Sequence, residues 1–308
     1  MIKDIRSGFD CDGIYLIKDA YCINAQNGSN YIVMTLQDSS GTIDGKMFNV
    51  GPKEIEVFKG GNVVKVEASA STYKDKLQVV INDGELIDSN KVDVSSLIPS
   101  SPIPLPDLLK EMNQFIDSLK DEDIKNIVRT TIDDNYQKYI DNPAAVRNHH
   151  DFYHGLLFHS LSMCRVASAL ANLYPDVDYD LLVGACLLHD IGKTKELSGP
   201  ILTKYTLEGD LLGHLTIGAE MVEETCKKLN IQGEKPLLLK HMILSHHGKL
   251  EFGACVLPQT KEAYMLSVID DLDAKLMSID KAMKNVKKGE FSDKIFAMDN
   301  RMFYKPSK

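Results

Sequence analysis

The sequence predicts a multidomain α+β protein in which a small β-barrel precedes an all-helical domain. Three observations support this prediction: strand-like runs fill residues 1–90, a proline-rich segment follows, and the apolar residues beyond it recur at helical spacing. A chain of 308 residues is long enough for two domains, each with its own core. We place the domains at 1–94 and 146–308, with a linker and helical connector at 95–145.

The first domain contains short apolar and β-branched runs that are broken by Asn, Gly, Asp and Ser. These runs are GIYLIKDAYCI, NYIVMTLQD, TIDGKMFNV and the longer NVVKVEASASTYKDKLQVVIN. The residues SSG separate the second run from the third, and this arrangement predicts a β-hairpin. About five short strands in so short a segment favour a small barrel, and the OB-fold is the natural candidate.

The segment after the barrel changes character twice. Residues 95–109, SSLIPSSPIPLPDLL, contain four prolines, which is typical of a semi-rigid spacer. Helical periodicity then predicts helices within residues 108–140, 155–174, 179–190, 211–229, 235–247 and 260–286. The aromatic tail from residue 292 is expected to pack on the body of the protein or on a neighbouring chain.

Composition narrows the classes of function. The net charge is −9, whereas a protein that grips duplex nucleic acid by charge is normally basic. Any contact with nucleic acid should therefore be local, or made through a metal on a phosphate. No apolar stretch of about 18 residues predicts a transmembrane helix, and the N-terminus lacks the apolar centre of a signal peptide, so we expect a cytoplasmic protein with no membrane partner. The six cysteines form no C-x-x-C pair, which argues against a cysteine zinc site.

All nine histidines lie between residues 149 and 247, in the helical part. Five consecutive predicted helices each carry a His or an Asp in an apolar setting: His159, His189 with Asp190, His214, His246 with His247, and Asp270 with Asp271. A lone buried His is more often a core residue than a ligand, and a His pair can simply cap a helix C-terminus. Recurrence in five helices favours a metal site instead, because burying such groups is costly unless they are paired or bind a metal. We interpret His241 as structural.

His159, the His189-Asp190 pair and Asp270 match the H…HD…D pattern of the HD-domain metal-dependent phosphohydrolases. His214 and the 246–247 pair match the two extra positions of members that hold two metals. The stretch NPAAVRNHHDFYHGLLFHSLSM, together with HDIGK, ILSHHGKLEFG and VLPQTKEA, resembles the YhaM family of bacterial 3′→5′ exoribonucleases, which join an N-terminal OB-fold to an HD domain. The resemblance covers nearly the whole chain, including the order of the domains.

The resemblance implies two divalent cations that share Asp190 as a bridge, in the two-metal arrangement for displacement at phosphorus. One cation would take His159, His189, Asp190 and Asp270, and the other would take Asp190, His214, His246 and His247. Imidazole and carboxylate ligands suit Mn²⁺, Fe or Zn better than Mg²⁺, and the family favours manganese. A metal-activated water would attack the terminal phosphodiester, and Lys193 would neutralise the charge that builds on the phosphoryl oxygens.

Contacts with the substrate are predicted at two places. His149 and His150 precede the first ligand helix and would orient substrate or support the ligands; a plain surface loop is the alternative. The barrel would stack the bases of single-stranded RNA, or of single-stranded DNA, on exposed aromatic residues. The candidates are Tyr15, Tyr21, Tyr31, Phe48 and Tyr73, although several of these must fill the barrel core instead.

Three functions remain open on the sequence. The first is a 3′→5′ exoribonuclease, the second is a nucleotide or cyclic-nucleotide phosphohydrolase, and the third is a non-catalytic single-strand or replication-origin binding factor. Residues 1–90 hold nine Lys and Arg against thirteen Asp and Glu, which predicts a weak grip on a strand or a partner-binding role for the barrel. A neighbouring subunit could cover this acidic face, so a homo-oligomer is also expected.

Overall fold

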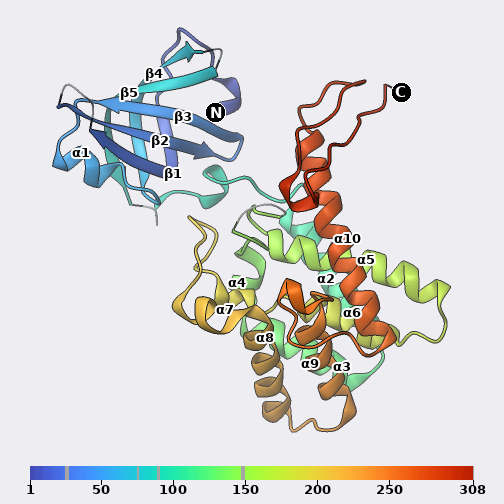
Figure 1. The fold of residues 1–308 in the computed structure, drawn as a ribbon. Coiled ribbons are helices and arrows are strands. Elements are labelled where there is room, and N and C mark those ends of the chain that lie inside the picture. Colours follow the sequence, from blue (N-terminus) through green and yellow to red (C-terminus); the bar gives the residue numbers. More distant parts are fainter. Residues whose placement is uncertain (25–27, 75, 89–90, 147–149, 308) are drawn as a thin grey trace. The chain divides into compact units, whose positions relative to one another are not determined.

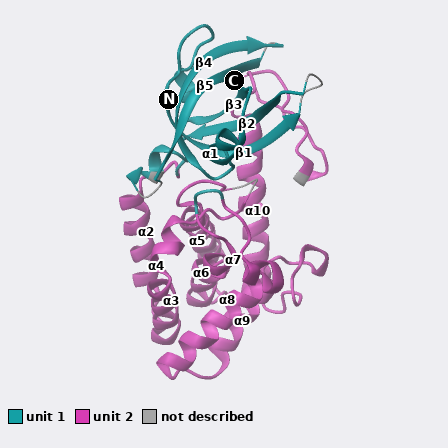
Figure 2. Cartoon of the chain, turned by 90° about the vertical axis from the view of Figure 1, so that its left-hand side faces the viewer, with its two compact units in different colours: residues 1–100, 200–202 teal, residues 101–199, 203–308 magenta. Residues whose placement is uncertain are grey.

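The computed structural model describes residues 1–24, 28–74, 76–88, 91–146 and 150–307 (Figure 1). The chain divides into two compact units, each with its own hydrophobic core (Figure 2). Unit 1 comprises residues 1–100 with 200–202, and unit 2 comprises residues 101–199 with 203–308.

Unit 1 is a closed five-stranded barrel with the strand order β1-β2-β3-β5-β4, in which only the β3–β5 pair is parallel. Its elements are β1 (Gly13–Asn24), β2 (Asn30–Asp38), β3 (Gly41–Phe48), α1 (Pro52–Val57), β4 (Val63–Tyr73) and β5 (Lys76–Ile87). The predicted run at 62–82 therefore holds parts of two strands. This barrel confirms the predicted OB-fold, and the hairpin predicted at SSG is the turn between β2 and β3.

Alternation along β3 shows why this sequence forms a barrel wall. Ile43, Gly45 and Met47 face inward, while the residues between them face outward. Gly45 leaves little room for a side chain, because a Cβ there would lie 3.2 Å from the side chain of Met34 and 3.3 Å from that of Val79. Tight packing of this kind fixes the register of the strands that carry the outer surface.

Unit 2 is helical. Its helices are α2 (Leu105–Ser118), α3 (Glu122–Asp134), α4 (Tyr136–Asp141), α5 (Gly155–Leu173), α6 (Tyr179–Leu188), α7 (Lys193–Glu196), α8 (Leu207–Leu229), α9 (Glu234–Ser245) and α10 (Lys261–Met283). Side chains of Asp121, Asp178, Thr206 and Thr260 accept hydrogen bonds from the first turns of α3, α6, α8 and α10. These caps fix where the longer helices begin.

Residues 95–145, predicted as a linker and helical connector, lie on both sides of the boundary between the two units. Leu97 and Ile98 are buried, and α2 already begins at Leu105. Helices α2 to α4 contribute Leu108, Ile124 and other residues to the same core as α5 to α10. The compact units accordingly divide between residues 100 and 101. Amphipathic helices bury their apolar face on whatever core is available, and here that core is unit 2.

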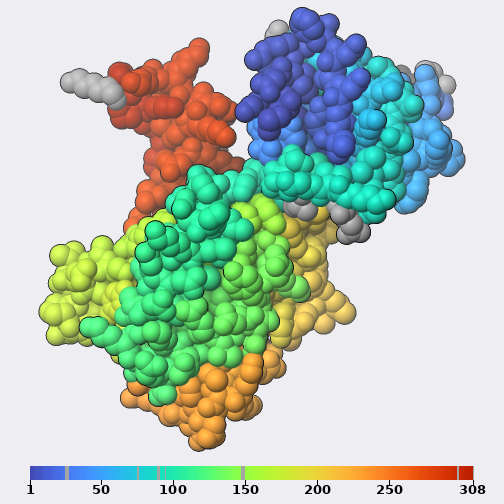
Figure 3. Space-filling model, turned by 180° about the vertical axis from the view of Figure 1, so that it is seen from behind, coloured from blue at the N-terminus to red at the C-terminus, as the bar shows by residue number. Residues whose placement is uncertain are grey.

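Two further features of unit 2 matter below. Helix α5 is long and apolar enough to cross a membrane by length and composition, but ten of its residues are buried within unit 2. Residues 284–307, which we call the C-terminal arm, follow α10 and project from the rest of unit 2 (Figures 1 and 3). The arm folds back on itself through isolated bridges between Phe291 and Tyr304 and between Ile295 and Arg301.

Candidate metal centre

Five helices of unit 2 bring the predicted ligands together. Helix α5 carries His159, α6 ends just before His189 and Asp190, α8 carries His214, α9 ends just before His246 and His247, and α10 carries Asp270. Gly192 allows this approach, because a Cβ at Gly192 would lie 2.1 Å from the carbonyl oxygen of His214. The glycine of the HDIGK motif is therefore required by close contact between the start of α7 and the part of α8 that follows its kink at Gly213.

The first group of ligands lies around the Nε2 atom of His159. This atom is 3.2 Å from Oδ1 of Asp270 and 3.2 Å from Nε2 of His189. Oδ2 of Asp190 is 3.3 Å from Nε2 of His189 and 3.8 Å from Nε2 of His159. Two imidazole nitrogens and two carboxylate oxygens, all of them potential metal ligands, thus surround one small space.

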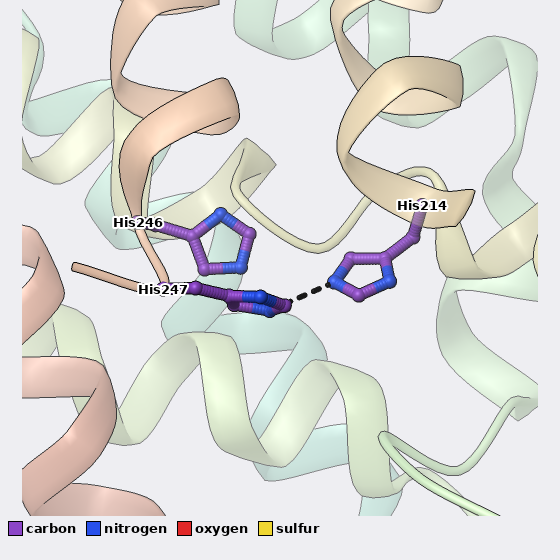
Figure 4. A group of neighbouring side chains, drawn as sticks. All are labelled: His214, His246 and His247. Atoms are coloured by element: carbon purple, nitrogen blue, oxygen red, sulfur yellow. Dashed lines mark hydrogen bonds between the residues drawn. The ribbon is translucent and has the colours of Figure 1, made fainter. Parts of the chain in front are cut away.

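The second group lies on the other oxygen of the same carboxylate. Oδ1 of Asp190 is 3.4 Å from Nε2 of His214 and 3.6 Å from Nε2 of His246. The Nε2 atoms of His214 and His247 are 3.3 Å apart, and the rings of His246 and His247 pack edge to face (Figure 4). Asp190 therefore presents one oxygen to each group of histidines.

The Nδ1 atom of every histidine in the two groups lies within hydrogen-bond distance of an acceptor oxygen. Backbone carbonyl oxygens of Cys186, Ile243 and Phe252 lie 2.9, 2.7 and 2.9 Å from the Nδ1 atoms of His189, His246 and His247. A carbonyl oxygen only accepts, so Nδ1 donates and the Nε2 lone pair points inward. Metal-binding histidines are held in this way.

Carboxylates hold the remaining two histidines. Oδ2 of Asp273 lies 2.7 Å from Nδ1 of His159, and Oε1 of Glu196 lies 2.9 Å from Nδ1 of His214. Glu196 also accepts a hydrogen bond from the backbone N–H of His214 at 3.0 Å. Oδ1 of Asp190 is buried and accepts no hydrogen bond from the residues that the structure describes. Inward lone pairs and a buried carboxylate oxygen without a donor fit a divalent cation in each group.

The charges of the centre are strongly coupled. Burial acts to raise the pKa of Asp190, but the Lys193 ammonium and His189 outweigh it and hold that pKa well below its usual range. Burial acts to lower the pKa of His159, but hydrogen bonds to Asp270 and Asp273 raise it to about 10. Without a cation, the centre is therefore held together by a proton on His159 between carboxylates.

Lys193 lies where the sequence places it, beside the shared carboxylate. Its Nζ atom donates to Oδ2 of Asp190 at 2.6 Å. Burial acts to lower the pKa of Lys193, but Asp190 raises it, so the ammonium is charged at neutral pH. Lys193 and Asp190 line an open cavity of about 310 Å³ together with His214, His246, His247 and Asp270. The Lys193 ammonium on the wall of this cavity can contact an anionic substrate.

Of the two roles predicted for His150, contact with substrate does not fit the structure, whereas support of the ligands does. Only 1% of His150 is exposed, and its Nε2 atom lies 2.7 Å from Oδ2 of Asp273. The rings of Phe152, Phe158 and His159 surround it. His150 therefore supports a ligand rather than facing the cavity. His149, the other predicted residue of this pair, lies outside the described residues.

Asp273 is one of two functional residues that the sequence analysis missed. It lies against His159, His150 and the hydroxyl of Ser162, which donates to it. The spacing could have signalled this role, because Asp270 and Asp273 are three residues apart on one face of α10. Asp271 lies off that face, is exposed, and pairs with Lys275 at 2.6 Å. Glu196 was also missed, seven residues after His189.

His241 lies apart from these groups, where its Nε2 atom accepts a hydrogen bond from the backbone N–H of Gln259 at 3.0 Å. This contact agrees with the structural role that the sequence analysis gave to His241.

The predicted aromatic residues of the barrel fall into two sets. The prediction for Tyr15 is wrong, because Tyr15 is buried in the barrel and donates from its hydroxyl to the carbonyl of Cys11 at 3.2 Å. Tyr31 and Phe48 form a cross-strand pair on the outer surface of β2 and β3, with ring centroids 5.9 Å apart. Phe48 is half exposed, so this pair is available to a ligand.

A lysine side chain lies beside the exposed aromatic rings of the barrel. The ammonium of Lys46 lies 5.1 Å from the ring centroid of Tyr73, and both Tyr73 and Tyr21 are exposed. In OB-folds, the face of the second and third strands binds oligonucleotides.

Comparisons with known proteins agree with the two-domain organisation. Residues 156–275 match the family model described as "HD domain", and residues 17–87 match the one described as "OB-fold nucleic acid binding domain". An OB-fold and an HD domain thus follow one another in this chain. The HD domain indicates a metal-dependent phosphohydrolase, and the pair of domains supports one that binds nucleic acid.

Two solved structures resemble the barrel. Both are domains of replication protein A from Methanococcus maripaludis, and one is described as its second OB-fold domain. The first is 18% identical, covers 28% of this chain and 92% of its own, and has a TM-score of 0.24. The second is 15% identical, covers 30% of this chain and 97% of its own, and also has a TM-score of 0.24.

Proposed function

We propose that this protein is a metal-dependent 3′→5′ exoribonuclease that hydrolyses the terminal phosphodiester of single-stranded RNA, with single-stranded DNA as a second substrate. The observation that carries the proposal is the position of Asp190, whose two carboxylate oxygens each face a separate group of histidines. Paired cation positions that share a carboxylate are the arrangement used for displacement at phosphorus. The 3′→5′ direction is supported by the resemblance of the motifs around His159 and His189 to the YhaM family.

Two cations would each be held by one group of residues together with one carboxylate oxygen of Asp190. His159, His189 and Asp270 would hold one with Asp190, while His214, His246 and His247 would hold the other. Manganese is the proposed metal, with iron or zinc as alternatives, because imidazole and carboxylate ligands suit these ions. When bound, such ions lower the pKa of a coordinated water and polarise phosphoryl oxygens.

Other residues of the chain orient the ligand histidines and place positive charge near the substrate. Asp273 and Glu196 fix the rings of His159 and His214 so that their Nε2 atoms face inward. Lys193 places a permanent positive charge at the cavity, where it can stabilise charge that develops on the phosphoryl group. The barrel offers the Tyr31–Phe48 pair as a surface on which bases of the substrate strand can stack.

The proposal is tested with 5′-labelled single-stranded RNA, purified protein and added Mn²⁺. We expect a ladder that shortens from the 3′ end, is absent with EDTA, and is absent for Asp190→Asn. Asp280→Asn is the matched control, because Asp280 is an exposed residue of α10 that does not line the cavity. Intact RNA under all conditions would contradict the proposal.

A second candidate is a phosphohydrolase that acts on nucleotides or cyclic nucleotides. The excess of Asp and Glu in residues 1–90 favours it, since an acidic barrel binds a polyanion weakly. Length dependence separates the two candidates. A strand-guided enzyme should cleave a twenty-nucleotide RNA with a much lower KM than a dinucleotide, whereas equal kinetic constants would favour the small-molecule enzyme.

A further inference from the structure

The C-terminal arm differs in charge from the rest of the protein. Residues 284–307 contain six Lys and Arg against three Asp and Glu, although the whole chain has a net charge of −9. Four aromatic residues occur among these 24 positions, whereas aromatic residues make up 7% of the chain. Basic and aromatic side chains together are the composition of a surface that binds single-stranded nucleic acid.

The lysines at the base of the arm are available for a ligand. Lys284, Lys287 and Lys288 are exposed and make no ion pair with the residues that the structure describes. Lysines often follow a helix simply because they stabilise its C-terminal dipole. Here, however, Lys305 already donates to the carbonyl of Met283 at the end of α10, at 3.0 Å.

The aromatic residues of the arm are presented outward on an ordered support. Backbone hydrogen bonds between Glu290 and Lys305 and between Ser292 and Phe303 hold the two sides of the arm together. Phe296 near the tip is 87% exposed, and Phe291 is also mostly exposed. An ordered arm keeps such rings at the surface, where leaving them in water is unfavourable unless a partner covers them.

The arm is connected to the metal centre by a rigid element. Helix α10 carries Asp270 at the centre and continues for thirteen residues to Met283. At 1.5 Å per residue this distance is about 20 Å. A strand whose end lies in the cavity extends beyond it by at least this length once it is several nucleotides long.

We propose that the C-terminal arm is a second binding surface for the single-stranded nucleic acid substrate. Lys284, Lys287 and Lys288 contact phosphate groups, and Phe296 stacks on a base. The inference rests on the proposed function, because it requires a strand as substrate. It also explains how a protein with an acidic barrel can hold a polyanion, since the positive charge lies on the other unit.

The test is the binding of a 5′-fluorescent twenty-nucleotide RNA to the full-length protein in EDTA, followed by anisotropy at several salt concentrations. The triple variant Lys284→Gln, Lys287→Gln and Lys288→Gln should raise Kd by about 100-fold at 0.1 M salt and reduce the log–log salt slope by about 2, since each phosphate contact on a single strand contributes about 0.7. Phe296→Ala should raise Kd about tenfold with an unchanged salt slope, because stacking releases no counterions.

The matched control changes three exposed lysines of α2, α4 and the loop after α2 that have no ion pair among the described residues. Lys110→Gln, Lys120→Gln and Lys138→Gln alter net charge equally and should leave Kd within about twofold. Equal losses in both triple variants would overturn the inference, because the effect would then be one of net charge.

Other outcomes separate this inference from the proposed function. If the wild type degrades RNA and the arm variants bind it as tightly as the wild type, the inference fails and the proposed function stands. If the wild type binds no RNA at all, both fail. If the arm variants lose affinity together with a change of oligomeric mass in light scattering, the arm joins copies of the chain and the inference is overturned.

Discussion

The carboxylate of Asp273 lies 2.7 Å from Nδ1 of His159 and holds the ring that faces the centre of the metal site. The same oxygen lies 2.7 Å from Nε2 of His150, and the hydroxyl of Ser162 donates to the other oxygen. Asp273, on α10, is therefore fixed by two side chains of α5 and by one from the loop before it. A histidine held in this way has one ring orientation before any cation arrives.

Asp273→Asn should weaken Mn²⁺ binding about 10- to 100-fold, because the amide cannot hold His159 as the carboxylate does. Isothermal titration of the metal-free protein with Mn²⁺ measures this directly. Asp280→Asn, at an exposed position of the same helix that does not line the cavity, is the control, and its affinity should equal that of the wild type. Equal affinities for both variants would show that Asp273 does not position the ligand.

Asp190→Asn should lose both cations and all turnover, because each group of histidines loses the carboxylate oxygen that it shares. Metal analysis of the purified variant should give well under one ion per chain. A variant that retains two ions per chain, or full activity on RNA, would refute the assignment of Asp190 as the shared ligand.

Lys193→Met should reduce kcat by about 10²- to 10³-fold, since it removes a fixed positive charge from the cavity. Metal content should stay at the wild-type level, which separates this effect from loss of ligands. Lys195→Met, two residues further along α7, is the control and should keep wild-type kcat. An unchanged kcat in Lys193→Met would remove this residue from the mechanism.

Ionised Asp273 should stabilise the metal-free protein, and this contribution to the free energy of unfolding should be lost in acid. Burial acts to raise the pKa of Asp273, but hydrogen bonds from His150 and His159 outweigh it and hold it below its usual range. The folded state then binds fewer protons than the unfolded state, whose Asp pKa is about 3.9, so this stabilisation is present above that pH and is lost as pH falls below it. Urea midpoints of the wild type and Asp273→Asn should therefore differ at pH 6 and converge in strong acid. A difference that stays constant with pH would contradict the ion pair.

Two tyrosines of the barrel should behave differently. Tyr15→Ala should destabilise the protein by about 3–5 kcal/mol, as expected for a buried aromatic residue. Tyr31→Ala should leave the unfolding midpoint almost unchanged and weaken RNA binding by about tenfold, because it removes one ring of the exposed pair. Thermal unfolding and RNA anisotropy measure the two effects. Loss of RNA affinity without loss of stability in Tyr15→Ala would reverse these roles.

The sequence by itself determined the order and class of the two domains, because hydrophobic periodicity changes from strand-like to helical along the chain. It also determined which residues were candidate ligands. Imidazole and carboxylate groups in apolar runs are costly enough that their recurrence carries information, and His159, Asp190 and Asp270 stood out for this reason.

The tertiary structure decided what local spacing could not. Whether Tyr15 or Tyr31 faces outward depends on which side of the barrel wall each side chain occupies after the strands close, and both sit in similar strand-like runs. His150 and Asp273 are 123 residues apart in the chain, and no local pattern predicts a pair that only helix packing brings together. Hydrophobic patterns can be recognised in the local sequence. The orientation of a buried polar group, in contrast, depends on the few neighbours that the folded core places around it.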